Sequence, residues 1–96
     1  MVSIEWTNDA NFDFDQILTY LSNASPQYAQ SLYEKIHDAL VNLEKFPRMG
    51  KKVSESKNKQ DRELSIQSYR LIYRYLEKED KIIILMLIHG SRVLKL

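Results

Sequence analysis

The 96-residue chain contains no cysteine, two glycines and two prolines. Without cysteine, the chain can form neither a disulfide framework nor a thiolate metal site. Two glycines are too few for a glycine-rich phosphate loop, and the sequence contains neither a GxSxG nor an HExxH pattern. We therefore expect no cofactor and no metal site.

Long hydrophobic runs are also missing. The longest run covers residues 82–88, far short of the roughly 18 residues that a membrane-spanning helix needs. Residues 1–12 have neither a basic start nor a continuous apolar stretch, so no secretory signal is predicted. A hydrophobic share of 44% and a charged share of 28% are typical of globular proteins. We expect a single cytoplasmic domain over residues 1–96, without a large internal cavity.

Charge is distributed unevenly along the chain. Residues 1–47 contain seven acidic and two basic side chains, whereas residues 48–70 contain seven basic and three acidic ones. The formal net charge of +1 therefore hides segments of opposite sign. Such an asymmetry predicts that the second half presents a basic surface to an anionic partner.

The first half predicts a strand followed by two helices. Alternating apolar and polar residues at 2–6 indicate a half-buried strand, and helical spacing then predicts a helix over about residues 9–22. Ser25 and Pro26 are good N-cap and first-turn residues for a second helix of about twenty residues, which Pro47 ends. The apolar stripe of this second helix consists of Ala29, Leu32, Tyr33, Ile36, Leu40, Leu43 and Phe46.

The second half predicts a loop and then a meander. Residues 48–61 are polar and basic and indicate a long loop, with a short strand near Val53. Strand patterns follow from residues 62, 69 and 82, with turns at 67–68 and 77–81. We predict an α+β fold of order β-α-α-β-β-β, with an antiparallel sheet of about four strands and the helical hairpin packed on one face.

Two arginines are expected on the open face of that sheet. Alternation in "YRLIYRYL" places Arg70 and Arg74 on the side opposite the tyrosines, which pack under the helices. Arg74 is interpreted first as a solvated side chain. For Arg70 two interpretations stay open: a solvated side chain, or an anion-binding group that meets Arg62 and the loop lysines.

The chain ends its apolar run with "HGSR". His89 shares the strand face of Leu85 and Leu87, Gly90 allows a sharp turn, and Arg92 can bind phosphate bidentately. His89 is either a hydrogen-bonded structural residue or a proton-transfer group. Arginine, lysine and histidine together could bind an RNA backbone and stabilise the charge formed when a 2′-hydroxyl attacks the phosphate, without a metal.

The motifs "SP…A…L…FP.MG", "REL…SYRLIYRY" and "LIHGSR", in this order, resemble the RelE/ParE superfamily of toxins from bacterial type II toxin–antitoxin systems. Together with the N-terminal "IEWT", the matching stretches extend over nearly the whole chain. The resemblance implies the fold predicted above. It also implies a growth-inhibiting toxin that a cognate antitoxin neutralises by wrapping around it.

The resemblance leaves the target open between DNA gyrase, as for ParE-like members, and mRNA on the translating ribosome, as for RelE-like endoribonucleases. For the ribonuclease, the catalytic candidates are Arg62, Arg70, His89 and Arg92, and the candidates for target or phosphate binding are Lys51, Lys52 and Arg74. No aromatic residue follows His89, and a net charge of +1 is low for docking into ribosomal RNA. The ParE-like target is therefore favoured. A third interpretation is an inert relative that only binds an antitoxin, so whether the chain is an enzyme stays open.

Overall fold

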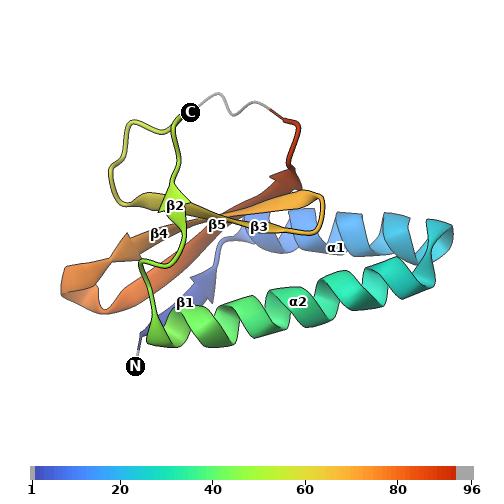
Figure 1. Cartoon of the computed structure of the whole chain (residues 1–96), viewed down its shortest axis with the longest axis horizontal. Coiled ribbons are helices and arrows are strands. Elements are labelled where there is room, and N and C mark those ends of the chain that lie inside the picture. The colour runs from blue at the N-terminus through green and yellow to red at the C-terminus, as the bar shows by residue number, and fades with distance from the viewer. Residues whose placement is uncertain (1, 93–96) are drawn as a thin grey trace.

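The computed structural model describes residues 2–92. In chain order, this part contains β1 (Ser3–Trp6), α1 (Asn8–Ala24), α2 (Pro26–Lys45), β2 (Lys51–Lys52), β3 (Asp61–Ile66), β4 (Tyr69–Leu76), a short 3-10 turn η1 (Glu77–Glu79) and β5 (Lys81–His89). The two α-helices form a hairpin that covers one face of a single sheet (Figure 1). The predicted α+β fold with a helical hairpin on one face is confirmed.

The sheet differs from the prediction in strand number and direction. Its order is β1-β5-β4-β3-β2, and β1 runs parallel to β5 while the other neighbours are antiparallel. The expected antiparallel sheet of about four strands is therefore wrong in detail: the described sheet is mixed and has five strands. The fifth strand, β2, is two residues long and lies directly before Val53, near which a short strand was expected.

Side-chain caps define where both helices start. Thr7 Oγ1 accepts a hydrogen bond from Ala10 N at 3.0 Å, and Ser25 Oγ accepts one from Tyr28 N at 3.4 Å. Such caps satisfy backbone donors that have no partner in the first helical turn. Pro26 begins α2 as predicted, whereas α1 extends slightly beyond the predicted residues 9–22 at both ends.

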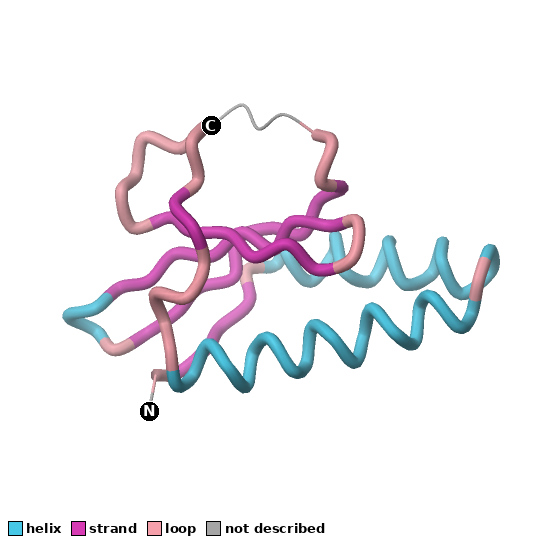
Figure 2. The backbone as a smooth tube through the Cα atoms, in the orientation of Figure 1, coloured by secondary structure: helices cyan, strands magenta, loops and turns pink. Residues whose placement is uncertain are grey.

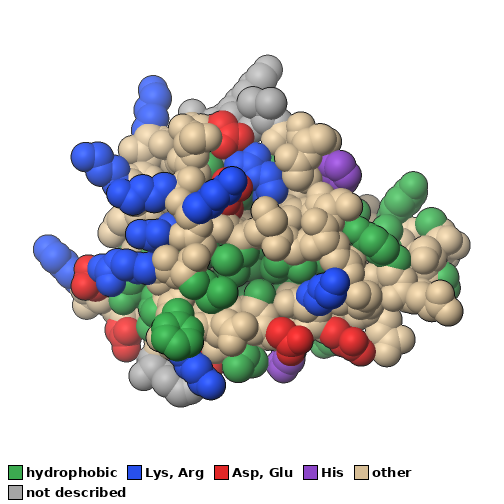
Figure 3. Space-filling model, in the orientation of Figure 1, with side chains coloured by type: hydrophobic (Ala, Val, Ile, Leu, Met, Phe, Trp, Pro, Cys, Tyr) green, Lys and Arg blue, Asp and Glu red, His purple; other side chains and the backbone are tan. Residues whose placement is uncertain are grey.

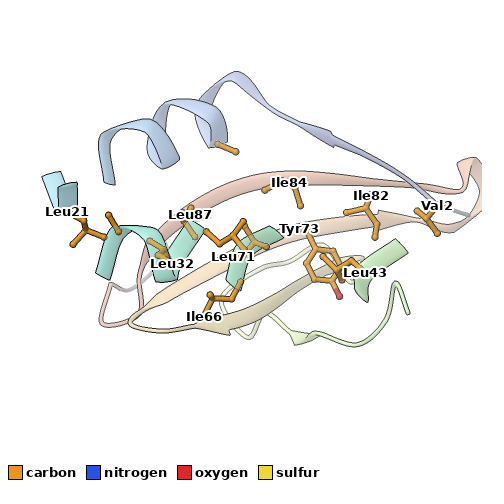
Figure 4. Packing of buried hydrophobic residues seen from close by; sticks show 13 residues of the cluster. Val2, Leu21, Leu32, Leu43, Ile66, Leu71, Tyr73, Ile82, Ile84 and Leu87 are labelled. Atoms are coloured by element: carbon orange, nitrogen blue, oxygen red, sulfur yellow. The ribbon is translucent and has the colours of Figure 1, made fainter. Parts of the chain in front are cut away.

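The core lies between the hairpin and the sheet. Leu32 and Leu43 of α2 point toward Leu71 and Tyr73 of β4, and all four are fully buried (Figure 4). The apolar stripe predicted for α2 is wrong at two positions. Tyr33 is 57% exposed and Phe46 is 64% exposed. Phe46 is the C-cap residue, so it lies past the last turn that faces the sheet.

A bulge in β5 changes the predicted alternation. Ile72 pairs with Met86 and Tyr73 with Ile84, so Leu85 is an extra residue that breaks the alternation. His89 therefore shares the face of Leu87, as predicted. Leu85 lies in the bulge, so the prediction that it continues the same alternation is wrong. Past the end of β1, side chains supply hydrogen-bond partners for the backbone of β5. Thr7 Oγ1 donates to Leu85 O at 3.2 Å, and Asp13 Oδ2 accepts from Leu87 N at 3.2 Å.

Candidate functional site

A groove of about 610 Å³ lies where β2, the β2–β3 loop and the start of β4 meet. Its lining includes Lys51 and Lys52 of β2, Glu55 of the loop, Glu63 of β3 and Arg70 of β4. The loop rises from β2 over the sheet (Figure 2). Three of the cations proposed from the sequence therefore lie around one groove, together with two acidic side chains.

Every N–H donor of the Arg70 guanidinium is hydrogen-bonded within the protein. Its Nε and Nη2 donate to Glu63 at 3.2 and 2.6 Å, and its Nη1 and Nη2 donate to Glu55 at 3.0 Å each. Nη1 also donates to the carbonyl of Arg92 at 3.1 Å. These five bonds equal the five N–H donors of a guanidinium. In this arrangement, no donor of Arg70 remains for a phosphate.

Burial strengthens this network. Arg70 is 9% exposed and Glu63 is 5% exposed, so both charges lie largely out of water. Hydrogen bonds to Glu55 and then Glu63 raise the pKa of Arg70, against the opposing effect of burial. Lys51 Nζ lies 3.8 Å from Glu63 Oε1 and adds a further positive charge at the rim. Arg70 is thus a buried cation enclosed by carboxylates.

Arg74 is neutralised in the same way. Its Nε and Nη2 donate to the two oxygens of Asp61 at 2.6 and 3.1 Å, a bidentate pair. Asp61 is 2% exposed and also accepts from Ser56 Oγ at 2.7 Å. The hydrogen bond to Asp61 raises the pKa of Arg74. Arg74 lies on the open face as predicted, as a partner of a buried acid.

Arg62 lies on the other face of the sheet. Arg62 pairs across the ladder with Tyr73, whose ring faces the helices, whereas Arg70 pairs with Ser65 on the open face. Nη1 of Arg62 donates to the carbonyls of Arg48 at 3.2 Å and Gly50 at 2.7 Å. The structure therefore does not bring Arg62 together with Arg70, because alternation along β3 and β4 separates them.

His89 occupies a third place. It pairs with Tyr69 across the ladder, with ring centroids 5.7 Å apart in an edge-to-face arrangement. His89 Nδ1 lies 2.7 Å from Ser91 Oγ and accepts from Ser91 N at 3.2 Å. Arg92 contributes its carbonyl to Arg70, and its side chain is exposed. The four catalytic candidates thus do not converge on one point.

Sequence reasoning missed the acids that hold the arginines. Asp61 and Glu63 lie two residues apart on the same face of β3. Asp61 is directly opposite Arg74 of β4, and Glu63 is diagonal to Arg70, so both ion pairs could have been inferred from the register. Glu55 could not, because it comes from a loop. Within residues 2–92, no group of three or more His, Asp or Glu side chains is placed to hold a metal ion, and no helix there is long and apolar enough to cross a membrane.

Comparisons with known proteins agree with this architecture. The family model described as the ParE toxin of type II toxin–antitoxin system, parDE, matches residues 4–94. No curated protein matches the chain. Among solved structures, the chain is similar to one from the chromosomal ParDE system of P. aeruginosa, with a TM-score of 0.73 and 21% identity over 95% of this chain and 98% of that one.

Two further solved structures share the fold. The intact E. coli RelBE toxin–antitoxin complex gives a TM-score of 0.68 at 14% identity, covering 96% of this chain and 100% of that one. The YoeB/ParE toxin from Agrobacterium tumefaciens gives 0.68 at 14% identity, covering 92% and 98%. Because the family model spans nearly the whole chain, this protein belongs to the family of ParE toxins of type II toxin–antitoxin systems, within the RelE/ParE superfamily.

Proposed function

We propose that this toxin arrests growth by inhibiting DNA gyrase through protein–protein contact, without chemistry of its own. The observation that carries the proposal is the state of the candidate catalytic residues. A metal-independent ribonuclease needs free cations and a proton-transfer group around one phosphate. In this chain Arg70 is saturated by Glu55, Glu63 and a carbonyl, and Arg62 lies on the other face of the sheet.

The proposal agrees with the family comparison. The matching family model is named for the ParE toxin, and one similar structure comes from a ParDE system. The name of the family model supports a ParE-like target, whereas the likenesses to the ParDE and RelBE structures, at 21% and 14% identity, support the fold alone.

We further propose that a cognate antitoxin binds the helical hairpin. Phe12 and Tyr20 of α1 are 63% and 69% exposed, and Tyr33 of α2 is 57% exposed. Tyr33 lines a groove of about 260 Å³, where Phe14 stacks between Trp6 at 5.5 Å and Tyr33 at 6.1 Å. Exposed aromatic residues beside an apolar groove are typical of a protein-binding surface.

The deciding experiment is pulse-labelling of DNA and protein synthesis in bacteria within minutes of inducing the chain without an antitoxin. We expect DNA synthesis to fall first. The purified chain should also inhibit supercoiling by purified gyrase, and co-expression of the antitoxin should restore growth. An earlier fall of protein synthesis, with no effect on purified gyrase, would reject the gyrase proposal.

Ribosome-dependent mRNA cleavage is the second candidate, and one observation favours it. His89 and the side chain of Arg92 are both exposed, and Gly90 between them lines the groove. If the ribosome is the target, cuts should appear in translated mRNA and a His89→Gln variant should lose them. Cuts that persist in a folded His89→Gln variant would exclude His89 as the proton-transfer group. An inert antitoxin-binding protein would cause no growth defect in either assay.

A further inference from the structure

A further, smaller pocket lies where the turn after α2, the start of β3 and the end of β4 meet. Its volume is about 140 Å³, and its lining includes Arg48, Lys59, Arg62, Tyr75 and Glu77. A water molecule occupies ~30 Å³ of liquid volume, so this space corresponds to about five waters and can hold one tetrahedral anion. It lies apart from the groove beside Arg70, with which it shares no lining residue.

Arg62 is held in a fixed orientation at this pocket. Its Nη1 donates to the carbonyls of Arg48 and Gly50 at 3.2 and 2.7 Å, while its remaining N–H groups make no hydrogen bond to any described residue. No acidic side chain among residues 2–92 lies within ion-pairing distance of Arg62. A half-buried guanidinium with unused donors is prepared to bind an oxyanion.

The neighbouring charges leave the pocket positive. Arg48 is already paired, with Glu77 at 2.5 Å, and its guanidinium lies 5.1 Å from the centre of the Tyr75 ring. This pair accounts for the one acid of the lining. Lys59 makes no ion pair with any residue of the described part, so Lys59 and Arg62 leave two uncompensated positive charges. Lys and Arg side chains also gather over β2 and the adjoining loop (Figure 3).

We infer that this pocket binds a phosphate group. Two uncompensated cations match the charge of a phosphate better than that of a single carboxylate, and the fork of Arg62 suits paired phosphate oxygens. The phosphate can belong to a free nucleotide or to a nucleic-acid backbone, since both present the same oxygens. The site is independent of the gyrase proposal, because it is defined by binding and not by toxicity.

The test is an NMR titration of the purified full chain with sodium phosphate at constant ionic strength. We expect saturable shifts of the amide signals of Lys59, Gln60, Arg62 and Tyr75, with no comparable change at Arg70. Sodium acetate at the same concentrations should not reproduce them. Shifts that follow acetate equally, that do not saturate, or that centre on Arg70 would overturn the inference.

Two variants distinguish specific phosphate binding in this pocket from general electrostatic attraction to a positively charged surface. Lys59→Gln should weaken phosphate binding by about tenfold, because a charge-assisted contact is lost. Lys59 is exposed and makes no hydrogen bond through its side chain to any described residue, so the variant should fold normally. Lys35→Gln, an equal charge change on α2, is the matched control and should bind phosphate as the wild type does. Equal losses in both variants would contradict a specific pocket.

Two further ligands identify the source of the phosphate. Adenosine monophosphate and a short single-stranded oligonucleotide should shift the same amide signals as inorganic phosphate does. Tighter binding of the oligonucleotide, decreasing as salt is raised, would assign the pocket to a nucleic-acid backbone. Equal affinity for all three would assign it to a free phosphate. Binding of neither organic ligand would overturn the inference that the pocket takes biological phosphates.

Discussion

Arg70 and Arg62 lie on opposite faces of the same sheet and represent two different uses of a guanidinium. Arg70 is 9% exposed and gives all its donors to Glu55, Glu63 and the carbonyl of Arg92. Arg62 gives one nitrogen to two carbonyls and has no acidic partner among residues 2–92. The first arginine holds the fold together, and the second is positioned by the fold.

The difference shows why a cluster of basic residues in a sequence is not yet a cationic surface. The open face carries Arg70 and Arg74, but Glu63 and Asp61 neutralise them across the strands. The smaller pocket has three cations, and two of them remain uncompensated because its one acid, Glu77, pairs with Arg48. The net charge of each site therefore depends more on its acidic side chains than on its basic ones.

The largest effect that tests this comparison should come from Arg70→Ala. Removing one partner of a buried ion pair leaves the other charge unpaired, which costs about 3–5 kcal/mol. We expect that loss in the free energy of unfolding, measured by urea denaturation, because Glu63 is 5% exposed. Arg62→Ala, which removes hydrogen bonds to two carbonyls, should cost only about 1 kcal/mol.

A double variant provides the control. Replacing Glu63 by Gln in the Arg70→Ala background removes the unpaired charge, so part of the lost stability should return. The ion pairs around Arg70 would not stabilise the fold if Arg70→Ala lowered the free energy of unfolding no more than Arg62→Ala does. The same conclusion would follow if the double variant recovered none of the lost stability.

Tyr73→Phe should give an intermediate effect confined to the Arg62 side. The Tyr73 hydroxyl donates to Pro47 O at 2.8 Å and accepts from Gly50 N at 2.9 Å. A side chain at Gly50 would collide with this hydroxyl, since an added Cβ would lie 2.7 Å from it. Losing the hydroxyl leaves buried polar groups without partners, at a cost of about 1–3 kcal/mol. Urea denaturation should show this loss, and the Arg70 network should be unchanged by NMR.

The same tyrosine predicts a dependence on alkaline pH. Burial raises the pKa of Tyr73 above its ordinary value of 10.0. Above that pH the unfolded chain loses the phenolic proton while the folded chain keeps it, so wild-type stability should fall as the pH rises. In the Phe variant this contribution is absent, and the stability difference between the two proteins should shrink from pH 9 toward pH 11. A constant difference over that range would contradict the raised pKa.

The elements of this fold could be predicted from the sequence where signals were local. Ser25, Pro26 and Pro47 mark the ends of α2, and alternation in residues 69–76 places the tyrosines of β4 under the helices. The short strand expected near Val53 corresponds to β2 at Lys51–Lys52, whereas the bulge at Leu85 could not be predicted, because it depends on how distant segments pair.

The candidate site was harder to predict than the fold. Basic residue types could be listed from the sequence, but their faces depend on strand register, which separates Arg62 from Arg70. Glu55 reaches Arg70 from a loop whose path no periodic pattern specifies. The chemistry of the groove is therefore set by acidic residues, which cannot be identified by looking only for catalytic cations in the sequence.

The smallest effect on stability, and the sharpest test of function, should come from Arg92→Ala. The variant removes an exposed side chain but keeps the carbonyl that Arg70 binds at 3.1 Å. The free energy of unfolding should therefore change by less than about 0.5 kcal/mol. We predict that growth arrest is nonetheless abolished, because this guanidinium is the exposed positive charge of the "HGSR" segment. Arrest by a well-folded Arg92→Ala protein would show that toxicity does not depend on this side chain. Loss of both arrest and stability would mean instead that Arg92 belongs with Arg70 among the arginines that hold the fold.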